Sequence, residues 1–251
     1  MEKLDKTMPK DKWEFDAEVT KVFDNMLDRS IPQYRVMREL VVKWAENYIG
    51  NDEVIIDLGS SRGEAIKSLM HLGTNNDFIA TEISDPMLEE LLLIPNTKNN
   101  IHVYNWDLRF NNGCLHDLYA GPIALDKSKF NPKKINLITS ILTLMFVPME
   151  HRQNLLRCVY QMLQEGGAFI IVEKVLGSTP ETNQSMVEQY LSMKEDNGYS
   201  TEEIDRKKAS LEGVLVPLTI EQNNLLFKNA GFKHSEIFWK WNNFTAWICI
   251  K

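Results

Sequence analysis

The sequence predicts an α/β protein with a doubly wound, mostly parallel seven-stranded sheet, a C-terminal antiparallel hairpin and an N-terminal helical cover. Short apolar runs alternate with helical patterns between residues 53 and 173, which is typical of parallel βαβ units. Two runs with period-two alternation, at 235–240 and 244–250, predict a hairpin at the edge of the sheet. An amphipathic repeat before residue 50 predicts the helical cover.

The N-terminal cover, residues 1–50, is predicted to be helical. Apolar residues recur at spacings of three and four between Val19 and Leu27, and again between Val36 and Trp44, so each set lies on one helix face. Pro32 separates the two helices, because the residue before a proline is disfavoured in the α conformation.

The strands of the alternating region are short and rich in β-branched residues, as expected for buried parallel strands. They are predicted at 53–58, 77–82, 101–105, 134–140 and 168–173. Helices are predicted at 64–72, 85–93, 151–163 and 220–230, with further polar helices between 179 and 211. Residues 111–134 interrupt this rhythm as an insertion loop rich in turn-forming residues.

Composition argues against several classes of protein. The chain has 251 residues, 35 acidic and 28 basic, with a formal net charge of −7, whereas direct nucleic-acid binding needs clustered lysine and arginine. Three scattered cysteines without a CxxC pair disfavour a disulfide scaffold and a cysteine zinc site. The charged N-terminus lacks the apolar core of a signal peptide, and no apolar run is long enough to span a membrane. We therefore expect a single cytoplasmic domain, residues 1–251.

The segment Asp57-Leu-Gly-Ser-Ser-Arg-Gly63 follows the first strand and is the richest binding motif. Ligands of doubly wound sheets bind at the carboxyl ends of the strands, and a glycine there lets the backbone approach the ligand. The spacing of Gly59 and Gly63 is not the GxGxxG of dinucleotide-binding folds, and the Lys-Ser/Thr pair of a P-loop is missing. The motif therefore disfavours a nucleoside triphosphate and makes Asp57 and Gly59 candidate cofactor-binding residues.

Two acidic residues follow the next strands. Glu82 closes the second strand, 23 residues after Gly59, where a carboxylate accepts hydrogen bonds from both hydroxyls of a ribose. Asp107 follows the third strand, where it can meet the exocyclic amine of an adenine, although a helix N-cap is an alternative role for it. The glycine turn, the ribose carboxylate and the adenine-edge aspartate together describe a site for S-adenosylmethionine.

From Phe15 to Lys251 the chain resembles the carboxy-S-adenosyl-L-methionine synthases, relatives of the class I methyltransferases. The matching stretches include Arg29-Ser-Ile-Pro-x-Tyr34, Thr143-Leu-x-Phe146, Glu173-Lys174, Asn197-Gly-Tyr-Ser200 and Ala230-Gly-Phe-x-His-Ser-Glu236. Several of them lie in the N- and C-terminal parts, which are not generic to methyltransferases. The resemblance covers about nine-tenths of the chain.

The resemblance implies a reaction in which S-adenosylmethionine and prephenate give a carboxylated sulfonium, with release of phenylpyruvate and water. It also implies that a partner enzyme uses the product to carboxymethylate a tRNA wobble uridine, that the protein is a homodimer, and that no metal takes part. Carried over by position, the implied ligand contacts are Tyr34, Gly59, Ser60, Ser61, Glu82, Ile83, Asp107 and Leu108.

Some implied positions depart from the family pattern. Ile83 and Ile141 stand where the family has polar residues, and Ile141 replaces an asparagine that contacts the ligand. Lys208 takes the place of the arginine that holds the extra carboxylate of the sulfonium. Arginine binds a carboxylate through a planar bidentate fork, whereas lysine offers a point charge, and Arg206 and Lys207 lie beside it in the sequence.

Two other functions stay open at this point. The first is a conventional methyltransferase that uses Ile83, Ile141 and the 111–134 loop to shape an acceptor pocket. The second is a non-catalytic protein that binds the nucleotide. For an enzyme, we expect catalysis by positioning and electrostatics without a protein nucleophile, because no Ser/His/Asp or Cys/His set stands out in the sequence.

Overall fold

The computed structural model describes residues 4–109 and 135–251, so the insertion predicted at 111–134 lies outside the described residues. The helices are α1 (Ala17–Ser30), α2 (Tyr34–Ala45), α3 (Glu64–Leu69), α4 (Asp85–Leu92), η2 (Leu144–Phe146), α6 (Met149–Met162), α7 (Pro180–Asp196), α8 (Thr201–Leu211) and α9 (Ile220–Ala230). The strands are β1 (Val54–Leu58), β2 (Asp77–Glu82), β3 (Asn100–Asn105), β4 (Ile135–Ile141), β5 (Ala168–Leu176), β6 (Leu218–Thr219), β7 (His234–Trp241) and β8 (Phe244–Ile250).

The strands form one sheet in the order β3-β2-β1-β4-β5-β8-β7. The first five of these strands are parallel, and β8 lies antiparallel between β5 and β7, as the predicted hairpin requires. The two-residue strand β6, which the sequence analysis did not predict, pairs with the end of β5. The doubly wound, mostly parallel fold with a C-terminal hairpin is therefore confirmed.

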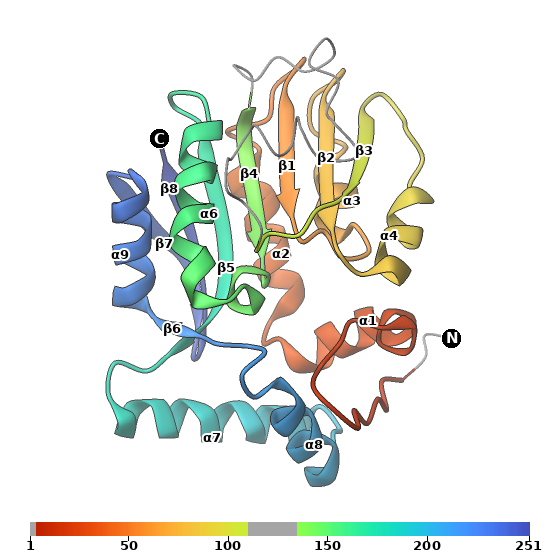
Figure 1. The fold of residues 1–251 in the computed structure, drawn as a ribbon, viewed down its shortest axis with the longest axis vertical. Coiled ribbons are helices and arrows are strands. Elements are labelled where there is room, and N and C mark those ends of the chain that lie inside the picture. Colours follow the sequence, from red (N-terminus) through yellow and green to blue (C-terminus); the bar gives the residue numbers. More distant parts are fainter. Residues whose placement is uncertain (1–3, 110–134) are drawn as a thin grey trace.

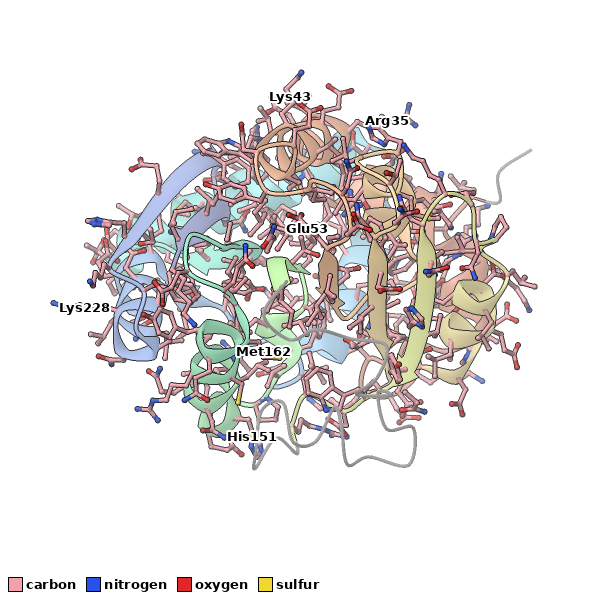
Figure 2. The ribbon with its side chains drawn as sticks, turned by 90° about the horizontal axis from the view of Figure 1, so that it is seen from above. Arg35, Lys43, Glu53, His151, Met162 and Lys228 are labelled. Atoms are coloured by element: carbon pink, nitrogen blue, oxygen red, sulfur yellow. The ribbon has the colours of Figure 1, made fainter. Side chains whose placement is uncertain are left out.

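Helices cover both faces of the sheet, with α2 on one side and α6 and α9 on the other (Figure 2). Successive residues of a strand point to opposite faces, so Ile55 belongs to the core beside α2 and Ile56 to the core beside α6. Both side chains are fully buried, which explains why the parallel strands read as continuous apolar runs.

The N-terminal region differs in detail from the predicted helical cover. Residues 4–16 form no helix, and α1 begins after Asp16, whose carboxylate accepts hydrogen bonds from the N–H groups of Glu18 and Val19. Helix α2 packs into the main core through Met37 and Val41. The division of the chain into a cover and a domain stays a prediction.

Helices α1, α7 and α8 form a separate layer beyond the carboxyl ends of the parallel strands (Figure 1). A small apolar cluster holds part of this layer together, with Trp13, Phe23 and Met26 buried against Met87 of α4. The backbone N–H of Trp13 donates to the carbonyl of Ser210 on α8 at 3.0 Å. The layer therefore covers the edge of the sheet where ligands of this fold class bind.

Candidate functional site

A cavity of about 280 Å³ lies between the carboxyl ends of the parallel strands and the layer of α1, α7 and α8. Its wall is mostly apolar, with a few polar and charged groups, as is typical of small-molecule sites. The predicted binding residues on this wall are Tyr34, Asp57, Gly59, Ser60, Ser61, Glu82, Ile83, Asp107, Leu108 and Ile141. The structure thus brings together all predicted site residues except Lys208.

The glycine loop is held in one conformation by contacts with β2 and with the segment after β4. Gly59 has a φ of +71°, which favours glycine, and a Cβ at this position would lie 2.3 Å from Cγ2 of Thr143. The hydroxyl of Ser60 donates to the carbonyl of Asp57 and accepts from the N–H of Thr81. Ser60 is therefore occupied in joining β1 to β2, so its backbone is the part available to a ligand.

Glu82 connects the end of β2 to the glycine loop. One carboxylate oxygen accepts a hydrogen bond from the N–H of Ser61 at 2.8 Å, and the other accepts from Ile83 at 2.8 Å and Ser84 at 3.0 Å. These bonds fix the orientation of the carboxylate at the cavity wall. The oxygen that binds Ser61 has a second acceptor direction, so it can accept a hydrogen bond from a ribose hydroxyl without breaking the existing bonds.

Asp57 is a buried carboxyl at the centre of the site. Its Oδ1 accepts a hydrogen bond from the hydroxyl of Thr139 on β4 at 2.6 Å. Burial raises the pKa of Asp57 despite this bond and despite the positive charge of Arg38. The group accordingly depends on nearby donors and cations to stay ionised.

Asp107 is paired with a residue two positions along the chain. The guanidinium of Arg109 donates to both carboxylate oxygens of Asp107, at 2.5–2.9 Å, and the backbone N–H of Arg109 donates at 2.9 Å. Burial opposes ionisation, but these hydrogen bonds outweigh it, so the pKa of Asp107 lies below its ordinary value. The carboxylate of Asp107 lies on the cavity wall.

Tyr34 and Arg38 bring helix α2 to the cavity, one helical turn apart. Burial raises the pKa of Tyr34 to about 12, so its hydroxyl stays protonated. Among the described residues, Arg38 forms no ion pair or side-chain hydrogen bond, and its guanidinium carbon lies 6.0 Å from the Tyr34 ring. Arg38 is not among the site residues predicted from the sequence, although its i+4 spacing from Tyr34 could have indicated a shared face.

Lysines line the cavity on the side of β5. They are Lys174 at the end of β5, Lys194 on α7 and Lys207 on α8. Lys208 is exposed and is not part of the wall, because adjacent residues of a helix point about 100° apart. Lys207 therefore occupies the inward position in this arrangement of the chain, and the carboxylate contact of Lys208 stays a prediction.

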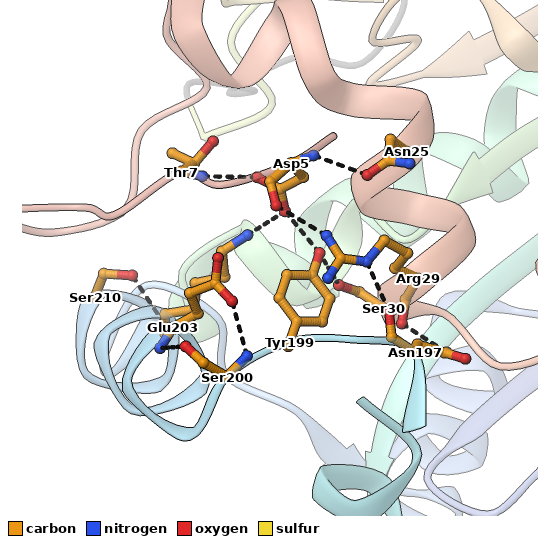
Figure 3. Close-up of polar contacts among 11 residues, drawn as sticks. Asp5, Thr7, Asn25, Arg29, Ser30, Asn197, Tyr199, Ser200, Glu203 and Ser210 are labelled. Atoms are coloured by element: carbon orange, nitrogen blue, oxygen red, sulfur yellow. Dashed lines mark hydrogen bonds and ion pairs between the residues drawn. The ribbon is translucent and has the colours of Figure 1, made fainter. Parts of the chain in front are cut away.

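Asp5 neutralises Lys207. Its Oδ2 accepts hydrogen bonds from the Lys207 ammonium and, at 2.6 Å, from the Tyr199 hydroxyl (Figure 3). Asp5 is fully buried and Lys207 is 3% exposed, so the pair lies out of contact with solvent. The guanidinium of Arg29 donates to the carbonyl of Asp5, and the whole network fastens the N-terminal segment to α7 and α8.

Two negative findings concern the described residues only. No three histidine, cysteine, aspartate or glutamate side chains within residues 4–109 and 135–251 gather closely enough to hold a metal ion. Within the same ranges, no helix is both long and apolar enough to cross a membrane.

Comparisons with known proteins address the identity of this site. Residues 56–171 match the model of the methyltransferase domain family. A carboxy-S-adenosyl-L-methionine synthase from Nautilia profundicola is 32% identical over 95% of this chain and 94% of that protein. The enzyme of the same name from Staphylococcus epidermidis is also 32% identical, over 95% and 97% of the two chains. The chain belongs to the carboxy-S-adenosyl-L-methionine synthase family.

Solved structures agree with this family at the level of the fold. A methyltransferase from Methanococcus maripaludis matches with a TM-score of 0.56 at 19% identity, over 98% of this chain and 97% of that one. Human N-acetylserotonin methyltransferase, solved with S-adenosylmethionine, matches with a TM-score of 0.57 at 13% identity, over 94% and 55% of the chains. This member of the synthase family therefore has the class I methyltransferase fold and is an S-adenosylmethionine-dependent transferase.

Proposed function

We propose that this enzyme carboxylates S-adenosylmethionine, with prephenate as the carboxyl donor, in the cavity between the sheet and the α1–α7–α8 layer. The observation that carries the proposal is that the predicted cofactor residues and the buried lysines line one continuous cavity. A conventional methyltransferase that uses only S-adenosylmethionine and a neutral acceptor gives no reason for this concentration of lysines.

The residues at the wall fit the cofactor. Glu82 presents a fixed carboxylate for the ribose, and the apolar side chains of Ile83 and Leu108 flank the region where an adenine would lie. Arg38 offers a guanidinium without a counter-ion among the described residues, which suits the α-carboxylate of the methionine part. The positive φ of Gly59 leaves backbone, and no side chain, facing the ligand at the end of β1.

The chain itself contributes binding, orientation and charge. When bound, S-adenosylmethionine supplies a sulfonium whose positive charge activates the neighbouring carbon. The described wall of the cavity contains no histidine or cysteine, so the described residues offer no nucleophile of those types there. Trp13 and Phe15 add apolar side chains to the wall, and surroundings of low polarity strengthen the interactions of the carboxylates and lysines with charged ligands.

Replacing Glu82 with glutamine is expected to weaken binding of S-adenosylhomocysteine by about 1–3 kcal/mol, or roughly 5- to 150-fold in Kd. The amide keeps the shape but has only one acceptor oxygen, so it loses backbone bonds and the charge that binds the ribose. Titration calorimetry measures the change. Glu89→Gln is the matched control, because Glu89 is exposed on α4 and does not line the cavity. Equal affinity for the wild type and Glu82→Gln would remove Glu82 from the site.

The function itself is tested by incubating the purified enzyme with S-adenosylmethionine and prephenate and analysing the products by mass spectrometry. Carboxylated S-adenosylmethionine and phenylpyruvate, formed in equal amounts, are the expected products. S-adenosylhomocysteine formed with a methyl acceptor, and no carboxylated product, would favour the methyltransferase instead. No turnover of the cofactor in either assay would contradict both functions.

We further propose the wider setting that the family resemblance implies. The product would serve a partner enzyme that modifies the wobble uridine of tRNA, so this protein itself needs no direct contact with nucleic acid. We propose that it acts in the cytoplasm as a homodimer, with residues 1–251 as one S-adenosylmethionine-binding domain. Analytical ultracentrifugation tests the dimer, and loss of the modified uridine on deletion of the gene tests the tRNA role.

A further inference from the structure

Lys174, Lys194 and Lys207 form a cluster beside β5. Among the described residues, its positive charges outnumber the carboxylates paired with them. The Nζ of Lys174 lies 4.4 Å from the centre of the Tyr190 ring, and the Nζ of Lys194 lies 5.7 Å from the same ring. Tyr199 continues the series, with its ring centre 4.9 Å from Lys194 and 4.7 Å from Lys207. The ammonium groups therefore alternate with tyrosine faces, which attract cations but carry no net charge.

Among residues 4–109 and 135–251, one lysine of the cluster has a carboxylate partner. Asp5 pairs with Lys207. Among the described residues, Lys174 and Lys194 form no ion pair and no side-chain hydrogen bond, although Lys194 is only 6% exposed. A buried ammonium normally has a hydrogen-bonded or charged partner, because desolvation of a charge is costly. Both side chains line the cavity, so an anionic ligand bound there would provide such a partner.

The pKa values of Lys174 and Lys194 are lowered because burial and repulsion from other lysines disfavour their charged forms. Burial lowers the pKa of Lys174 to about 8, with a further contribution from the charge of Lys208. Burial lowers the pKa of Lys194 to about 8 as well, and repulsion from Lys207 and Lys174 adds to the effect. The charged or titratable groups around the pair are Asp5 on the N-terminal segment, Arg29 on α1, Tyr190 on α7, and Tyr199, Lys207 and Lys208 on or before α8. Asp5 is the one carboxylate in this set.

The position of the cluster separates it from the cofactor residues. Glu82 ends β2 and Asp107 follows β3, while β1 leads into the glycine loop. Lys174 is on β5, which β4 separates from these three strands. The apolar side chain of Phe244, which pairs with Lys174 across β8 and β5 and packs against Tyr190, lines the cavity at this end. A ligand for this end thus needs negative charge and an apolar body, which describes an organic acid better than inorganic phosphate.

We propose that Lys174 and Lys194 bind the carboxylate groups of the second substrate, an organic dicarboxylate, at the β5 end of the cavity. The identity of that substrate rests on the proposed function, in which prephenate brings two carboxylates. Lys207, already neutralised by Asp5, positions α8. In this arrangement the two free ammonium groups select the carboxyl donor, while Arg38 and Glu82 hold the cofactor.

The test is titration calorimetry of prephenate with enzyme saturated by S-adenosylhomocysteine, which supports no turnover. Lys174→Met and Lys194→Met should each raise the Kd for prephenate at least tenfold and leave the Kd for S-adenosylhomocysteine within twofold, which also shows that the variants are folded. Lys228→Met is the matched control, because Lys228 lies on the outer surface of α9 (Figure 2). The affinity of the wild type should also fall between pH 7 and pH 9, because ammonium groups with pKa values near 8 lose their protons over this range.

Several results would overturn the proposal. They are an unchanged Kd for prephenate in both lysine variants, no binding of prephenate to the wild type, or equally tight binding of inorganic phosphate. The proposed function fails separately, if prephenate binds as described but the mass-spectrometric assay yields no carboxylated product. Conversely, carboxylated product with normal prephenate affinity in both variants would leave the function intact and remove the lysines from the site.

Discussion

Replacing Asp5 with asparagine should lower the free energy needed to detach the N-terminal segment by about 3–5 kcal/mol, because it leaves the Lys207 ammonium buried without its counter-ion. Native-state hydrogen exchange at the Trp13 amide, which donates to Ser210, measures this local opening. Denaturant unfolding measures the part of the loss that reaches the whole chain.

The double variant Asp5→Asn/Lys207→Met is the control, since it removes both charges. It should be more stable than Asp5→Asn alone, and the mutant cycle gives the coupling energy of the pair. If the double variant lost the sum of the two single effects, the ion pair would have no coupling and the explanation would be wrong.

Acid should weaken the contact between Asp5 and Lys207. Burial opposes the charge of Asp5, but hydrogen bonds from Lys207 and Tyr199 outweigh it, so its pKa is lowered in the folded protein. The stabilisation is therefore complete above the ordinary carboxyl pKa of about 4 and is lost as the pH falls through the lower, folded value. Hydrogen exchange at the Trp13 amide measures the free energy of local opening as a function of pH. In Asp5→Asn, this free energy should no longer fall with the titration of Asp5.

Replacing Gly59 with alanine is expected to lower the free energy of unfolding by about 2–5 kcal/mol. A left-handed conformation costs a residue with a Cβ about 1–2 kcal/mol, and the clash with Thr143 adds about 1–3 kcal/mol of overpacking. Urea unfolding measures the loss, and calorimetry should show weaker binding of S-adenosylhomocysteine because the loop must shift.

Two variants separate the causes of this loss. Gly166→Ala has nearly the same φ, +77°, but its Cβ would meet nothing within 4 Å, so it reports the conformational cost alone. Adding Thr143→Ala to Gly59→Ala removes the two closest atoms and should restore part of the stability. Equal losses in Gly59→Ala and Gly166→Ala would show that the contact with Thr143 contributes nothing.

Much of the fold could be predicted from the sequence because its signals are local. The strand Asp77–Glu82 and the helix Ile220–Ala230 have the bounds that the pattern of apolar residues predicts. The glycine loop and Glu82 could be placed at the cavity because both follow directly from strands, and the carboxyl ends of parallel strands meet at one edge. The strand β6 could not be predicted, because two residues are too few to show a repeating pattern of apolar side chains.

The sequence by itself determined the fold class, the family resemblance and the residues at the strand ends, since period, turn chemistry and motif order are all properties of neighbouring residues. Only the tertiary structure decided that Lys207 faces the cavity and Lys208 does not, because the difference is a rotation of about 100° about α8. Only the structure paired Asp5 with a lysine 202 residues away, and gathered Lys174 and Lys194 from β5 and α7. Such groups meet through packing over long sequence distances, which local pattern does not encode.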